Sequence, residues 1–164
     1  MQQLNYYSTL LSNKQLEDPQ QASDLDEEVN ILIHKLKYIP QEQRPTVLVL
    51  DQAVAFEPLF NEQLQDVVSI AGGLLIADKF DNPSIIMIVQ QNESLYSEIP
   101  ALLTDDIWSR TDALKNNNLF IIQKDNFGTS DDFLQEIEIS AEIIQPKYFI
   151  YGRQGVDWLK FDVS

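Results

Sequence analysis

The sequence predicts an α/β fold, a three-layer, Rossmann-like arrangement in which a mostly parallel sheet is flanked by helices. Two patterns support this prediction. Short apolar runs rich in β-branched residues alternate along the chain with segments of helical periodicity. The runs are continuously apolar, which is typical of strands covered on both faces, as in parallel sheets. A length of 164 residues with 44% hydrophobic residues suits one globular domain with a buried core.

The N-terminal part divides into a weakly patterned segment and a helix. Residues 1–22 are Gln-rich, and we expect them to form a poorly structured N-terminal segment. Residues 23–164 then form a single α/β domain that opens with a helix over residues 23–38. Ser23 is its expected N-cap, with Asp26 three residues on as a capping-box-like partner.

Residues 44–164 contain the predicted sheet and its covering helices. The buried strands are expected over residues 46–50, 74–76, 84–89 and 119–122. Two later helices are expected to begin at the N-caps Thr104 and Ser130. Residues 158–163 alternate between apolar and polar side chains, which predicts an edge strand.

Charge and composition exclude several classes of function. The chain has 11 Lys and Arg against 26 Asp and Glu, a net charge of −15 that repels nucleic acid and anionic membrane surfaces. Cysteine is absent, which excludes thiolate metal sites and cysteine nucleophiles. The one histidine, His34, falls on the polar side of the first predicted helix, so the sequence predicts no metal site.

The sequence shows no secretory signal and no apolar run long enough for membrane insertion. The chain as written is therefore expected to be cytoplasmic, whereas a trimmed sequence would be compatible with the periplasm or cell envelope.

Enzyme motifs are absent. Neither a Gly-rich phosphate loop nor a GxSxG nucleophile elbow occurs. Asp51 follows the first strand, where a carboxylate invites phosphoryl-transfer chemistry, but no second acid stands beside it. The favoured interpretation is that Asp51 closes the strand by accepting hydrogen bonds from loop amides, and that the protein is not an enzyme.

Five segments in the C-terminal two thirds resemble a known family in order and spacing. They are RPTVLVL (44–50), NEQLQDVVSIAGG (61–73), NPSIIMI (82–88), IWSRTDALKN (107–116) with the strand at 119–122, and QPKYF (145–149). Together they resemble the C-terminal lobe of the helical-backbone substrate-binding proteins that deliver cobalamin, haem or ferric siderophores to ABC importers. The helix over 23–38 stands where the end of the family's inter-lobe helix would be.

This resemblance implies non-catalytic binding of a small molecule or metal complex such as cobalamin, haem or a ferric siderophore. Family members hold the ligand between two lobes, and the sequence before residue 23 is too short for the other lobe. A homodimer would rebuild the missing wall. The family also docks to its ABC permease through a surface glutamate. The loop over 124–132 contains none, so permease docking stays open.

The expected ligand-binding residues lie in the loops that follow the strands, because α/β sheets bind ligands there. Phe56 and Phe127 are the expected aromatic platforms, and Gln52, Gln91 and Asn126 are the expected polar anchors. The alternative function is a degenerate protein-interaction or dimerisation module without a ligand.

Overall fold

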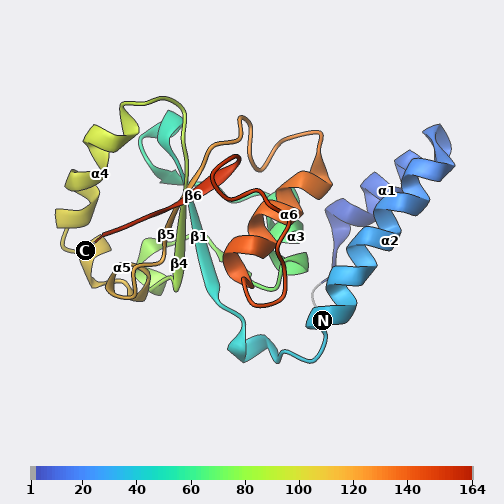
Figure 1. Cartoon of the computed structure of the whole chain (residues 1–164), viewed down its shortest axis with the longest axis horizontal. Helices are drawn as coiled ribbons and strands as arrows, with labels where there is room; N and C mark the ends of the chain where they lie inside the picture. Colours follow the sequence, from blue (N-terminus) through green and yellow to red (C-terminus); the bar gives the residue numbers. More distant parts are fainter. Residues whose placement is uncertain (1–2, 164) are drawn as a thin grey trace.

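The continuously apolar runs form the central strands of one sheet in the computed structural model, which describes residues 3–163 (Figure 1). The strands are β1 (Thr46–Asp51), β2 (Glu57–Pro58), β3 (Leu74–Ile76), β4 (Ile85–Val89), β5 (Leu119–Ile122) and β6 (Trp158–Phe161). The helices are α1 (Asn5–Glu17), α2 (Pro19–Leu36), α3 (Glu62–Ile70), α4 (Leu95–Thr104), α5 (Asp112–Lys115) and α6 (Phe133–Ile144). The predicted α/β fold with a sheet between helical layers is confirmed.

The sheet is mixed but mostly parallel. Its order is β2-β1-β4-β5-β6, and β3 pairs with the amino-terminal half of β1, on the opposite side from β4. Strands β1, β3, β4 and β5 are parallel to one another, whereas β2 and β6 are antiparallel to their neighbours. The predicted edge strand is β6, which pairs with β5.

The two faces of β1 explain why its sequence is apolar without alternation. Val47 and Val49 pack into the core that includes side chains of α3 and α6, and Leu48 and Leu50 pack into the core beneath α4 and α5. All four side chains are buried, since both faces of the strand are covered by helices. Figure 1 shows α3 and α6 on one side of the sheet and α4 and α5 on the other.

The order in which strands are added to the sheet changes side between β1 and β4. From β1 it passes through α3 to β3 on one side, and from β4 it passes through α4 and α5 to β5 on the other. Because parallel crossovers are right-handed, opposite directions of travel place these helices on opposite faces. The carboxyl ends of β1 and β4 therefore meet at a topological switch point, the usual place for a ligand in an open α/β sheet.

The N-terminal segment is helical, so the prediction of poor structure for residues 1–22 is wrong over the part that the structure describes. Helix α1 lies against α2, and the pair packs on α3 and α6 on the side away from the sheet (Figure 1). Helix α2 begins at Pro19, not at Ser23, because the Asp18 side chain caps it by accepting from the Gln21 N–H at 3.2 Å. Asp18 is thus the N-cap, and Pro19 is a proline in the first turn, where the missing N–H is tolerated. No helix among residues 3–163 has both the length and the apolarity to cross a membrane.

Two later helix starts are also corrected. Thr104 ends α4 instead of capping a helix, and its hydroxyl donates back to the Pro100 carbonyl at 3.1 Å. Thr111 caps the short α5 that follows. The last helix is capped by Asp132, which accepts from the Gln135 N–H at 3.0 Å.

Candidate functional site at the carboxyl edge of the sheet

The candidate site is built from the loops after β1, β4 and β5, which we call the carboxyl edge (residues 51–62, 90–98 and 123–132). The parallel register aligns the ends of these strands, with Asp51 opposite Val89 and Val89 opposite Ile122. Three glutamines follow the strand ends directly: Gln52, Gln90 and Gln123. The predicted polar anchors Gln52 and Gln91 are thereby brought together across the switch point.

The Gln52 side chain joins the two sides of the switch point. Its Oε1 accepts from the backbone N–H of Gln91 at 2.6 Å and of Asn92 at 3.0 Å. Its Nε2 lies 3.1 Å from Asn92 Oδ1, 3.2 Å from Ser94 Oγ and 3.1 Å from Glu98 Oε2. The amide predicted to anchor a ligand therefore binds the chain's own loop, which leaves Gln91, an exposed residue, as the accessible amide of this pair.

Phe56 lies in the tight turn that leads from β1 into β2. Its backbone N–H donates to the Asp51 carbonyl at 2.9 Å, and both Ala55 and Phe56 have positive φ angles, 58° and 62°. A positive φ is uncommon for a residue with a side chain and marks a locally strained turn. The ring is half-buried against the core beneath α4, so one part of it stays accessible.

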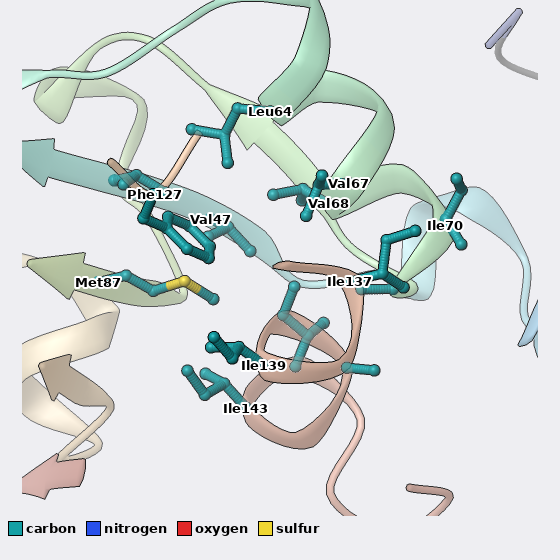
Figure 2. Packing of buried hydrophobic residues seen from close by; sticks show 14 of the residues in the cluster. Val47, Leu64, Val67, Val68, Ile70, Met87, Phe127, Ile137, Ile139 and Ile143 are labelled. Carbon is teal, nitrogen blue, oxygen red and sulfur yellow. The ribbon is translucent and has the colours of Figure 1, made fainter. Parts of the chain in front are cut away.

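Phe127 is a core residue and not an exposed platform, which corrects the prediction for this side chain. It is 2% exposed. Figure 2 shows its ring among Val47, Leu64 and Met87, on the face covered by α3 and α6. The neighbouring Asn126 is exposed and adopts a left-handed φ of 59°, as the turn into the buried ring requires.

A buried carboxylate holds the loop that carries Phe127. Glu136 of α6 accepts from the backbone N–H groups of Gly128 at 2.6 Å and Ser130 at 3.2 Å, and from Gln63 Nε2 at 2.8 Å. Burial raises the pKa of the Glu136 carboxyl, and these three donors partly offset that shift. The loop after β5 is consequently fixed by α6 and α3.

Asp51 has the structural role that its position predicts. Its Oδ1 accepts from the Ala53 N–H at 2.9 Å and so closes the strand. Within residues 3–163, no group of three or more His, Cys, Asp or Glu side chains is placed to hold a metal ion. Trp108 is 7% exposed and belongs to the core beneath α4.

Exposed apolar side chains that sequence reasoning did not select lie on the same edge. Val54 is 52% exposed, Phe60 is 45% exposed and Tyr96 is 40% exposed. The available signal was that Val54 and Phe60 are apolar residues in a loop without strand or helix periodicity. We call Val54, Phe56, Phe60 and Tyr96 the edge patch.

The carboxyl edge is also strongly acidic. Its three loops carry one lysine, Lys124, against eight acids: Asp51, Glu57, Glu62, Glu93, Glu98, Asp125, Asp131 and Asp132. An apolar patch among so many carboxylates favours neutral or cationic ligands, since an anion would meet repulsion at short range.

Neither a protein-family model nor a curated protein matches the chain. Solved structures do match it. An ABC transporter substrate-binding protein from Listeria monocytogenes superposes with a TM-score of 0.65 at 21% identity, over 84% of this chain and 63% of that one. Staphylococcus aureus IsdE complexed with heme gives 0.61 at 19% identity, over 87% and 65%. Helicobacter pylori CeuE in a nickel–histidine complex gives 0.56 at 14% identity, over 77% and 44%.

These similarities establish the fold and its extent. The chain resembles one lobe of ABC-importer substrate-binding proteins and spans about half to two thirds of the length of the structures it matches. The expected resemblance to a single lobe of that family is confirmed, and the residues that would contact a ligand are left to be tested.

Proposed function

We propose that the protein is a non-catalytic binding lobe that holds a small molecule or metal complex at the carboxyl edge of its sheet. The observation that carries the proposal is the edge patch, because its side chains come from the segments that follow β1 and β4, the two strands that form the switch point. Ligands of open α/β sheets bind at this position, and aromatic side chains dominate the energetics of such contacts. Tyr96 and Phe60 join Phe56, Gln91 and Asn126 as proposed contacts.

The charge of the edge narrows the ligand class. Eight carboxylates against Lys124 favour a neutral or cationic complex such as cobalamin over haem, whose propionates are anionic. A single lobe offers one wall, whereas small-molecule sites usually bury most of the ligand. A second copy facing the first would supply the other wall, so a homodimer is part of this proposal.

The test is a fluorescence titration of Trp108 and Trp158 with cobalamin, haem and a ferric siderophore, corrected for inner-filter absorption with free tryptophan. Saturable quenching is expected, strongest for cobalamin. Tyr96→Ala should weaken binding about tenfold, as for a well-packed aromatic contact. Tyr148→Ala is the matched control, since Tyr148 is an exposed tyrosine that follows α6 at the opposite edge. Equal loss in both variants, or no saturation with any ligand, would contradict the proposal.

The second candidate function is a protein-interaction or dimerisation module without a ligand. The five hydrogen-bonding contacts of the Gln52 amide favour it, because they fill the switch point with the chain's own side chain. Absence of quenching together with a Tyr96-dependent dimer in analytical ultracentrifugation would support this candidate.

A further inference from the structure

A concave site lies at the edge of the sheet opposite the carboxyl edge, where β1 and β3 begin. It is a cavity of about 350 Å³, within the range of small-molecule pockets. Apolar side chains from α2 and the segment after it, from α3 and from β3 form most of its wall, among them Ile33, Leu36, Ile39, Ile70 and Leu74. We call it the amino-edge groove. An apolar cavity of about 150 Å³ already holds a benzene ring, so this groove has room for a larger apolar body.

The charged side chains of the groove are both cations. Lys37 and Arg44 line it, and no Asp or Glu is among its described lining residues, although acids outnumber basic residues 26 to 11 in the whole chain. The uncharged polar wall comes from Gln41 and Ser69. The groove therefore combines a mostly apolar wall with two cationic side chains, so its charge is opposite to that of the acidic carboxyl edge.

Arg44 also removes an electrostatic obstacle to an anion. Helices α2 and α3 both end at the groove, and their terminal carbonyls would repel a negative charge. The Arg44 guanidinium donates to the Leu36 carbonyl at 3.0 Å and to the Ser69 carbonyl at 3.3 Å. These bonds satisfy the two carbonyls and hold the guanidinium in place. Lys37 adds a second cation to the groove, with its ammonium 5.0 Å from the centroid of the exposed Tyr38 ring.

We propose that the amino-edge groove binds an amphipathic monocarboxylate, with its apolar chain on Ile33, Ile39 and Leu74 and its carboxylate at Arg44 and Lys37. A guanidinium has more N–H donors than the two that bind the Leu36 and Ser69 carbonyls, so Arg44 keeps donors for a carboxylate, and the apolar chain matches the rest of the wall. The site is separate from the carboxyl edge and does not depend on the function proposed there.

The probe is decanoate, used below its micelle concentration, with decanol as the uncharged analogue of the same chain length. Binding is followed by methyl NMR of the full chain. We expect saturable shifts confined to the methyl groups of Ile33, Leu36, Ile39, Ile70 and Leu74, and weaker binding of decanol. Equal affinity for decanol and decanoate would overturn the carboxylate assignment, and shifts spread over the whole chain would overturn the site.

Two variants of equal net charge separate a local contact from the field of the whole protein. Lys37→Glu should weaken decanoate binding roughly five- to tenfold and leave decanol unchanged, because it reverses one exposed charge in the groove. Lys35→Glu should have little effect, since Lys35 lies over the Phe149 ring, 5.4 Å from its centroid, and does not line the groove. An equal effect of the two variants would contradict the proposal.

Discussion

Two buried carboxylates of α6 accept hydrogen bonds from backbone amides of the loops on either side of this helix and so fix those loops. Glu142 accepts from the backbone N–H groups of Tyr151, Gly152 and Arg153 at 2.7, 3.0 and 3.1 Å, and from Trp158 Nε1 at 3.1 Å. Glu136 does the same for the loop after β5. Each carboxylate replaces the water that its donors lose on folding, because a buried donor without a partner is costly.

We predict that Glu136→Ala destabilises the protein strongly. Glu136 is fully buried, and the substitution leaves the N–H groups of Gly128 and Ser130 without this acceptor, each lost partner costing about 1–3 kcal/mol. The Gln63 amide keeps only its bond to the Ser130 carbonyl. Urea unfolding should show a lower midpoint with an unchanged slope. Glu27→Ala is the control, because Glu27 is an exposed acid and its removal also lowers the net negative charge by one. Similar stability of the two variants would show that the loop does not depend on Glu136.

At the residue scale, the sequence predicts which residues lie at the strand ends better than it predicts what their side chains contact. Asp51 caps the strand end as predicted, since the acceptor and its donor are two residues apart. The burial of Phe127 and the contacts of Gln52 depend on partners about 40 or more residues away in the sequence, which no local pattern contains. Gln52 and Phe127 were therefore placed correctly on the edge but with the wrong surroundings.

Helix α1 shows how a tertiary contact stabilises an element that its own sequence does not signal. Its first residues carry no side-chain cap of their own. Asp66 of α3 accepts from the Tyr7 N–H at 2.9 Å instead, and the Tyr7 hydroxyl donates to Asp26 of α2 at 2.7 Å. The capping acceptor is 59 residues away in sequence, which explains why the local sequence of residues 1–22 predicts little structure.

The docking of α1 predicts a pH dependence of stability. Burial, with a smaller contribution from Glu62, raises the pKa of the Asp66 carboxyl above 3.8, and the amides of Tyr7 and Tyr6 partly offset this. The folded state therefore takes up a proton at higher pH than the unfolded state. The wild type should gain stability relative to Asp66→Asn as the pH falls from neutral toward 3.8. Urea unfolding of both proteins at each pH tests this, and a difference that is constant with pH would contradict it.

The other elements could be predicted where a local sequence pattern specifies them. Strands β1, β4 and β5 were predicted within one residue, because burial on two faces produces a continuous apolar run in the sequence. The two-residue β2, which is exposed, was not predicted. Helix α4 was not predicted, since Pro100 lies inside it and proline usually breaks a helix. For this reason Thr104, the last residue of α4, was wrongly predicted to be the N-cap of a helix.

At the scale of the whole molecule, one lobe carries two surfaces of opposite charge at the two edges of a single sheet. The carboxyl edge is acidic and includes the edge patch, and the amino-edge groove is cationic. The fold class and the resemblance to one lobe were predictable, because both rest on the order of segments along the chain. The exposure of Phe60 and Tyr96 was not, since it depends on how three loops meet.

The most direct test of the central claim is amide NMR of the isotope-labelled protein titrated with cobalamin and a gallium-substituted siderophore, which are both diamagnetic. We predict saturable shifts concentrated in residues 51–61, 90–96 and 123–130, with the side-chain amides of Gln91 and Asn126 among the most affected. Shifts confined to the amino edge, or no saturable shifts with either ligand, would contradict the assignment of the carboxyl edge as the ligand-binding surface.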